Sequence, residues 1–245
     1  MKKFSIIFAA LVIAGMACAC KNNDDPVNDG GNGNKEAAVN IKIDGVFDDW
    51  KGEFASADLA DIEETAYPNL TLMKAAGDAK NLFLYFEYKL AEGQTVAPID
   101  ILINSDGDAS TGFTSWIWSK EGCGWDFMLE SELGFLGENN TITDLADMAV
   151  YKCIEGDGQD AWDAGSKFEQ QNAGDFIACK GTVKDGVAYF EVSILRSVIN
   201  ANRKGNISLG ITMTDATTGD WVTKGILPQG EDGIGTADML EVALP

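Results

Sequence analysis

Hydrophobic and polar residues alternate with a period of two along much of the chain after residue 36, which is the pattern of half-buried β-strands. The predicted strands are Val39–Ile43, Leu70–Ala76, Leu82–Tyr88, Ile99–Ile103, Trp125–Glu130, Ala149–Ile154, Phe176–Val183, Val187–Ile194, Ile207–Thr214 and Met239–Leu244. Helical periodicity is confined to Ala57–Glu64 and Leu195–Asn202. Many short strands and few helices predict an all-β fold, a jelly-roll-like antiparallel β-sandwich with one or two short helices.

The N-terminal segment has the layout of a lipoprotein signal. Two lysines precede the apolar run Phe4–Met16, which is shorter than the roughly 20 residues that a membrane-spanning helix needs. The run ends in small residues and cysteines, and the chain then turns polar. We therefore predict a signal peptide over 1–19 and lipidation of Cys20, with Cys18 as the alternative acceptor. An ordinary secretory signal is the competing interpretation.

The segment 20–35 is rich in Gly, Asn and Asp, a composition typical of a flexible tether. The remaining residues, 36–245, are enough for one substantial core, and we expect a single domain. Lys21 followed by an Asp-Asp pair also resembles the surface-export signal of lipoproteins in Gram-negative, glycan-degrading gut bacteria. That resemblance implies a lipid anchor in the outer membrane, with the domain facing the cell exterior or the periplasm.

The formal charge of −21 restricts the partners that the chain can bind. Nucleic acids and anionic lipid surfaces require Lys/Arg patches, so neutral sugars, divalent cations and basic partners remain. Histidine is absent, which removes His-dependent triads and His-ligated zinc or haem. Three domain cysteines, Cys123, Cys153 and Cys179, lack metal-site spacing, and either one disulfide with one buried thiol or three buried thiols fits them.

Four segments of the chain carry distinctive motifs, at Ile41–Trp50, Asp100–Gly112, Gly124–Glu130 and Val187–Leu195. In this order they resemble the motifs of family nine carbohydrate-binding modules and their DOMON-related cousins. Ile41–Trp50 resembles the opening I-x-I-D-G-x-x-D-x-W signature, and Asp100–Gly112 resembles the strand with an acidic loop. Gly124–Glu130 and Val187–Leu195 resemble the two later acid-containing strands, although Arg196 stands where proline is usual. The resemblance implies a β-sandwich of the carbohydrate-binding-module type that binds sugar without catalysis.

In such modules aromatic side chains usually stack on the sugar ring. The aromatic residues in polar, glycine-rich loops of this chain are Phe113, Trp116, Trp118, Trp162 and Trp221. Exposed rings on loops suit a sugar platform, because the apolar faces of sugars pack on them while neighbouring carboxylates and amides bind the hydroxyls. The other tryptophans, Trp50 and Trp125, lie beside predicted strands and are expected in the core.

The loop after Ile103 alternates oxygen-bearing side chains in a pattern that hard cations use. Asn104, Asp106 and Asp108 stand at alternate positions, and Gly107 permits a sharp bend, as in an EF-hand loop. The distal glutamate of an EF-hand is missing, so a calcium ion would need another ligand. Because family nine modules commonly hold structural calcium, calcium is the expected cofactor, with a solvated Asx-rich turn as the alternative.

Three acids lie within apolar strands and are candidates for perturbed pKa values: Asp126, Glu130 and Glu191. We interpret them as structural, because the resemblance places them in a non-catalytic framework. The predicted function is therefore glycan binding by a membrane-anchored lipoprotein that serves a glycan capture or degradation system, with other surface glycan-utilisation proteins as candidate partners. Alternatives are a protein-interaction subunit, a glycoside hydrolase or lyase using Asp126 or Glu130, and DOMON-type haem binding through Met or Cys.

Overall fold

The computed structural model describes residues 39–62, 65–94, 96–113, 123–136, 141–143, 149–153, 168–172, 177–215, 222–230 and 238–245. The chain divides into two units, Met1–Lys35 and Glu36–Pro245, and all described elements belong to the second. The predicted signal peptide, Cys20 and the tether lie outside the described residues. No helix in the described part of the chain has the length and apolar character to cross a membrane.

Strands dominate the described chain. In order, the elements are η1 (Phe47–Lys51), β1 (Ala55–Asp58), η2 (Leu59–Asp61), β2 (Leu70–Gly77), β3 (Asn81–Lys89), β4 (Val96–Asn104), β5 (Phe127–Leu136), β6 (Thr141–Thr143), β7 (Ala149–Cys153), β8 (Phe168–Asn172), β9 (Ile177–Lys184), β10 (Val187–Leu195), β11 (Gly205–Asp215), β12 (Val222–Leu227) and β13 (Leu240–Leu244). Every pair of neighbouring strands is antiparallel.

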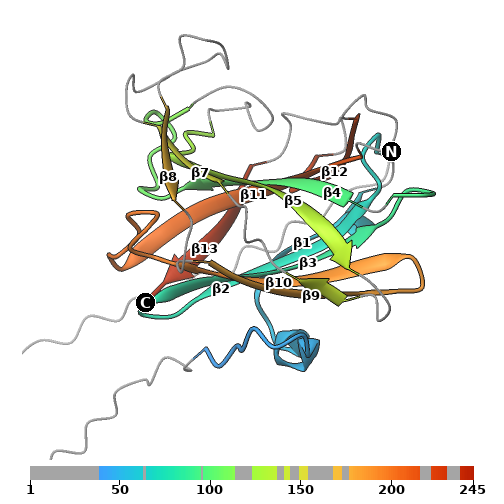
Figure 1. Ribbon diagram of the computed structural model, residues 1–245. Coiled ribbons are helices and arrows are strands. Elements are labelled where there is room, and N and C mark those ends of the chain that lie inside the picture. Colours follow the sequence, from blue (N-terminus) through green and yellow to red (C-terminus); the bar gives the residue numbers. More distant parts are fainter. Residues whose placement is uncertain are drawn as a thin grey trace, which may run out of the picture. The chain divides into compact units, whose positions relative to one another are not determined.

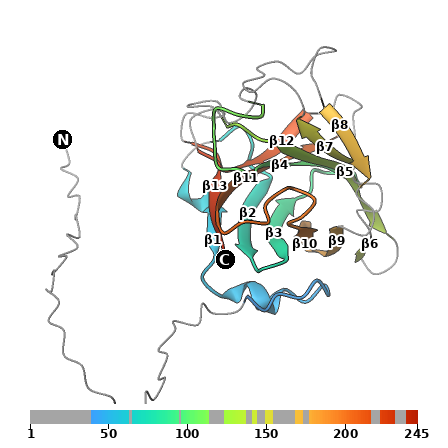
Figure 2. The ribbon, with the colours of Figure 1, turned by 90° about the vertical axis from the view of Figure 1, so that its left-hand side faces the viewer.

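The strands form two layers that face each other (Figures 1 and 2). Sheet A has the order β1-β2-β3-β10-β9-β6, and sheet B has the order β12-β11-β4-β5-β7-β8, with β13 paired to β11 beside β12. The far end of β5 pairs with β6 and joins the sheets at one edge. At the other edge an isolated bridge connects Pro68 to Gly225 of β12.

The core fills the space between the sheets because each strand turns one set of alternate side chains inward. On β10 these are Ala188, Phe190, Val192 and Ile194, all fully buried. Phe190 stacks on Phe86 of β3 with ring centroids 4.7 Å apart. The prediction of an all-β antiparallel sandwich is confirmed.

Every predicted strand from Leu70 onward overlaps an observed strand, but three other local predictions are wrong. Val39–Ile43 alternates as predicted but pairs with no strand among the described residues. The helix predicted over Ala57–Glu64 is the end of β1 followed by the single turn η2, because pairing with β2 outweighs the weak helical pattern. The helix predicted over Leu195–Asn202 is the last residue of β10 followed by turns.

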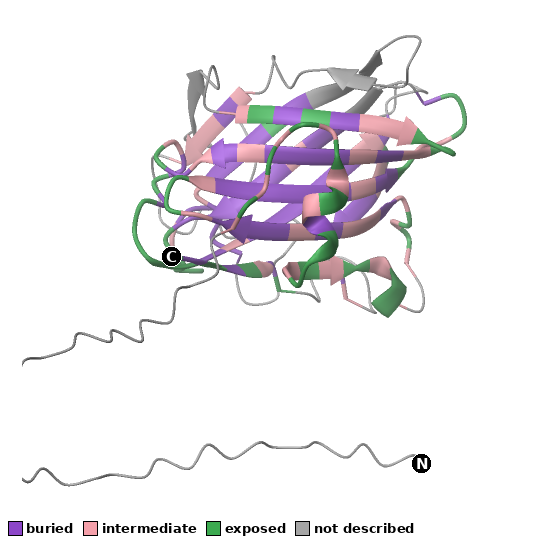
Figure 3. Ribbon diagram, turned by 90° about the horizontal axis from the view of Figure 1, so that it is seen from below, coloured by how far each residue is buried: buried purple, intermediate pink, exposed green. Residues whose placement is uncertain are grey.

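The outer face of each sheet is also partly covered. Residues 39–54, which we call the strap, cross the outer face of sheet A (Figure 3). There Trp50, Phe83 and Tyr85 are buried together, so Trp50 belongs to a second apolar cluster outside the central core. A third cluster, which includes Leu102, Met128 and the buried Trp125, lies on the outer face of sheet B.

The edge bridge between the sheets predicts a strict requirement for glycine at position 225. A Cβ there would lie 2.5 Å from Leu70 Cβ and 2.7 Å from Leu70 N. Because Leu70 is fully buried, Gly225→Ala should lower the free energy of unfolding by about 1–3 kcal/mol, measured by urea denaturation. The control Gly52→Ala meets only the Phe54 side chain, at 3.3 Å, and should change stability much less. Equal effects of the two substitutions would contradict the close approach.

Candidate functional site

The loop that follows β4 is held by its own side chains. Asn104 is buried, donates through Nδ2 to the Cys123 carbonyl at 3.2 Å, and accepts through Oδ1 from the Gly107 N–H at 2.7 Å. Asp106 Oδ1 accepts from the Asp108 N–H at 2.8 Å, and Asp108 Oδ1 accepts from the Ser110 N–H at 2.9 Å. Gly107 has a φ of +73°, a backbone conformation that residues with a side chain adopt only under strain. The segment is a series of Asx turns.

These contacts bear on the predicted calcium site at Asn104, Asp106 and Asp108. Asn104 and Asp108 each use one side-chain oxygen to hold the loop, and Asp106 uses both, since its Oδ2 accepts from the Thr111 hydroxyl at 2.9 Å. In the ranges given above no three acidic, cysteine or histidine side chains gather as a metal site. Calcium binding stays a prediction, which a calorimetric titration of the full chain with calcium, beside an Asp106→Asn variant, would decide.

Asp126 anchors the same loop from the start of β5. Its Oδ2 accepts from the Ser105 N–H at 2.8 Å, the Ser105 hydroxyl at 3.0 Å and the Asp106 N–H at 3.3 Å. Burial raises the pKa of Asp126, and the hydrogen bonds from Ser105 oppose that rise. The contacts assign Asp126 a structural role in shaping the loop.

Phe113 does not belong to an exposed platform. Its side chain is fully buried and stacks on Trp125 with ring centroids 4.8 Å apart, and reciprocal backbone hydrogen bonds of 2.9 and 3.1 Å join the two residues. The prediction that Phe113 lies open for a ligand is therefore wrong, because its apolar ring is more stable against Trp125 on the outer face of sheet B. The segment 114–122, with Trp116 and Trp118, begins and ends beside this bridge but lies outside the described residues.

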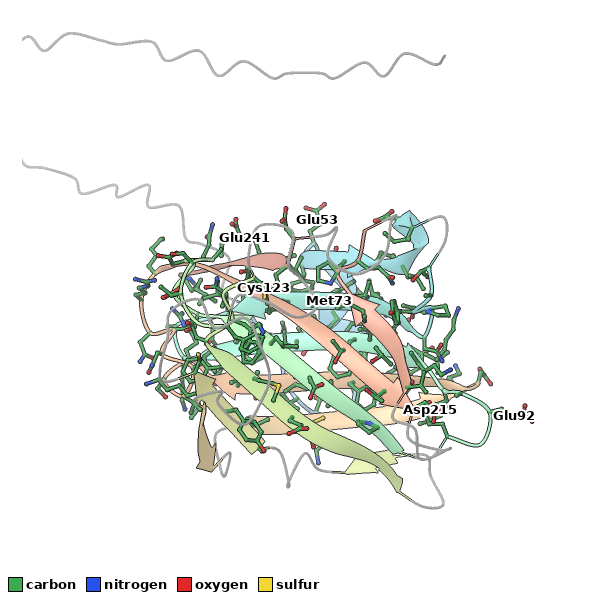
Figure 4. The ribbon with its side chains drawn as sticks, turned by 90° about the horizontal axis from the view of Figure 1, so that it is seen from above. Glu53, Met73, Glu92, Cys123, Asp215 and Glu241 are labelled. Carbon is green, nitrogen blue, oxygen red and sulfur yellow. The ribbon has the colours of Figure 1, made fainter. Side chains whose placement is uncertain are left out.

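Trp162 and Trp221 also lie outside the described residues, although the neighbour of Trp221 can be placed. Val222 begins β12, is exposed, and pairs with Asp215 at the end of β11. Cys123, which adjoins the segment carrying Trp116 and Trp118, lies beside Asn104 toward the opposite end of sheet B (Figure 4). The chain flanking the predicted aromatics thus approaches one sheet face from its two ends.

Between these ends, a polar row crosses the outer face of sheet B. Thr212 of β11, Asp100 of β4 and Glu130 of β5 stand directly opposite one another in the strand register. The Thr212 hydroxyl donates to Asp100 Oδ2 at 3.2 Å. Burial and the neighbouring Glu130 carboxylate raise the pKa of Tyr151 of β7, which places its hydroxyl near Glu130. We call these four residues the polar row. Sequence analysis identified only Glu130, because the strand neighbours that complete the row are fixed by tertiary pairing.

Burial and a neighbouring like charge disfavour ionisation of a carboxyl in the polar row. Burial is the largest cause that raises the pKa of Asp100 to about 6, and the neighbouring Glu130 carboxylate raises it further. Asp100 is half-buried and Glu130 is exposed. Neither carboxylate forms an ion pair within the described ranges. Both can accept hydrogen bonds from hydroxyl groups of a ligand, next to the half-buried Tyr151 ring, which packs against the buried Met128 cluster.

Glu191, the third acid of interest, lies on the other sheet and is fully buried beneath the strap. Its Oε1 accepts from the Asp44 N–H at 2.6 Å and from the Gly45 N–H at 2.5 Å. Burial raises the pKa of Glu191, and the two backbone donors oppose the rise. The interpretation of Glu191 as a structural acid therefore agrees with its contacts. No disulfide joins Cys123, Cys153 and Cys179; the first and third are buried and Cys153 is half-buried.

Comparison with known proteins finds similarity to solved structures. No protein-family model matches the sequence, and no curated protein matches it. Among solved structures, the chain is similar to a carbohydrate binding module family 9 (CBM9) from Caldicellulosiruptor kristjanssonii in complex with cellotriose. The match has a TM-score of 0.45 and 12% sequence identity, and it covers 84% of this chain and 90% of the other.

The raised pKa of Asp100 predicts a pH dependence of stability. The folded protein binds a proton at Asp100 more tightly than the unfolded chain does, whose carboxyl titrates near pH ~4. This contribution to the free energy of unfolding is complete below pH ~4 and is lost as pH rises through about 6. Asp100→Asn should therefore flatten the decline between those values, measured by urea denaturation at several pH values. The control Asp48→Asn changes a side chain that is 73% exposed, and a flattening of equal size there would contradict the assignment.

Proposed function

We propose that the chain is a carbohydrate-binding lipoprotein whose ligand lies along the outer face of sheet B. The single observation that carries this proposal is the polar row, where two carboxylates unpaired with cations in the described ranges adjoin the half-buried aromatic ring of Tyr151. Sugars offer both hydroxyl donors and apolar C–H faces, so this combination suits them. The ordered motifs in the sequence support the same class of ligand.

The predicted aromatic platform fits the same face. The segment that carries Trp116 and Trp118 begins and ends beside the Phe113–Trp125 bridge, and Trp221 precedes Val222 at the other end of the sheet. We propose that these tryptophans flank the polar row and stack on the sugar. A shallow site of this kind gains little free energy per contact, so we expect dissociation constants of about 10 μM to 1 mM.

The proposed action is capture without catalysis. Two of the three acids that the sequence singled out, Asp126 and Glu191, spend their carboxylates on backbone N–H groups and position loops. Glu130 faces solvent, where it can bind a hydroxyl group. We propose that a lipid anchor at Cys20 holds the chain in the outer membrane. The support for this location is the apolar run before Cys20 in the sequence.

The glycan proposal predicts that losing the carboxylate of Glu130 weakens binding. We expect a glycan array of neutral oligosaccharides to reveal ligands for the full chain, and calorimetry to show about a tenfold weaker affinity for Glu130→Gln, since a hydrogen bond to a charged group contributes about 1.5–3 kcal/mol. The double variant Trp116→Ala/Trp118→Ala should lose detectable binding. The matched control Glu53→Gln, at an exposed acid of the strap, should bind as the unsubstituted chain does.

Each outcome of that experiment decides something. If the folded chain binds no neutral or acidic glycan, the proposed function is wrong. If it binds but Glu130→Gln binds equally well, the ligand lies elsewhere than on the polar row. If the tryptophan variant still binds glycan, the proposed aromatic platform is wrong and the ligand binds to the sheet face alone.

A further inference from the structure

The strap is attached to sheet A in a different way from every strand of the sandwich. Across the described residues, no backbone-to-backbone hydrogen bond joins residues 39–54 to a strand. The strap is held instead by side chains: Glu191 accepts from the Asp44 and Gly45 N–H groups, and Lys74 Nζ donates to the Trp50 carbonyl at 2.8 Å. A segment without ladder hydrogen bonds can separate from a sheet while the sheet stays intact.

Aromatic contacts supply the rest of the attachment. Trp50 stacks on Tyr85 of β3 with centroids 5.7 Å apart, and Phe47 lies 5.7 Å from Tyr85 and 5.9 Å from Tyr189 of β10. All of these rings lie on the outer face of sheet A, away from the central core. Release of the strap would therefore expose one aromatic cluster and leave the packing between the sheets unchanged.

The buried polar atoms under the strap are incompletely satisfied. Glu191 Oε2 and Trp50 Nε1 are both buried, and neither has a hydrogen bond of normal geometry to a described residue, although the Trp50 side chain lies close enough to Glu191 to lower the pKa of its carboxyl. A buried carboxylate oxygen without a well-aligned donor has a free-energy cost that hydration would remove. Opening of the strap would return both atoms to water, so this cost lowers the free energy that opening requires.

The chain also provides a place for the strap to bend. Gly52 and Glu53 are exposed and separate Trp50 from β1. Strand β1 is itself paired residue by residue with β2, from Ala55 opposite Ala75 to Asp58 opposite Leu72. The boundary between side-chain attachment and strand pairing thus falls within residues 51–54.

We propose that residues 39–54 form a latch, locked to sheet A by Glu191, that opens as a unit while both sheets remain folded. The opening itself is independent of the proposed function. Its consequence rests on the proposed anchor at Cys20, because an open latch adds its residues to the tether and increases the distance that the domain can reach from the membrane. For a flexible chain this reach grows as about 5–6 Å multiplied by the square root of the number of residues.

Amide hydrogen exchange of the full chain, resolved by residue, tests the latch. We expect the Asp44 and Gly45 amides to exchange at least about tenfold faster than the paired amides of β3 and β10, because sub-global opening needs less free energy than global unfolding. Glu191→Ala should accelerate exchange of the two strap amides about tenfold further and leave the reference amides of β3 and β10 unchanged.

Asp126→Asn is the matched control, since Asp126 also accepts from backbone N–H groups but on sheet B, and it should leave strap exchange unchanged. If Glu191→Ala fails to fold, Gly45→Ala replaces it. Gly45 has a φ of +84° and its added Cβ would meet nothing within 4 Å, so this substitution strains the locked turn without disturbing the sheet. It should accelerate the Asp44 amide in the same selective way.

Equal exchange rates for strap and sheet amides, or equal acceleration of both by Glu191→Ala, would overturn the latch. Measuring glycan affinity in the same variant tests the proposed function separately from the latch. Because Glu191 and the polar row lie on different sheets, Glu191→Ala should leave glycan affinity within about twofold. Selective opening without glycan binding would keep the latch and reject the function, and the reverse result would do the opposite.

Discussion

The alternation of side chains across each strand is the constraint on which the rest of the structure depends. Because one set of side chains from every strand enters the space between the sheets, the opposite set is fixed on two outer faces. Each outer face must then be covered or must tolerate water. Sheet A is covered by the strap, and sheet B is covered in part by the loop that ends at the Phe113–Trp125 bridge. The part of sheet B that contains Asp100 and Glu130 remains accessible.

This constraint explains what the sequence could predict. Strands such as Val187–Leu195 alternate strongly because they contribute to the central core, so their positions follow from the pattern. The strap alternates as well, since Ile41 and Ile43 face sheet A, and the pattern therefore resembles a strand although the segment pairs with none. Periodicity reports that one side of a segment is buried, but it does not report whether the backbone is hydrogen-bonded to a neighbour.

The candidate site shows the same limit. Glu130 was noticed because it interrupts an apolar strand, whereas Asp100 and Thr212 are distant in sequence and become its neighbours only through the registers of β4, β5 and β11. The prediction of an exposed Phe113 is wrong for a related reason. Its local sequence is polar and rich in glycine, and the residue that buries it, Trp125, follows twelve positions later on the next segment of the sheet face.

Asp126 and Glu191, two acids that the sequence offers as reactive candidates, each hold a neighbouring turn in place, on opposite sheets. Asp126 accepts from the N–H groups of Ser105 and Asp106, and Glu191 accepts from those of Asp44 and Gly45. In each case an acid on a strand, or directly before one, holds a turn that contains glycine and aspartate. A carboxylate is suited to this role because one oxygen can accept from two consecutive backbone donors, which a turn points in a common direction. Burial raises the pKa of both groups, so a perturbed acid in a sandwich of this kind can mark the attachment of a covering segment as readily as a reactive site.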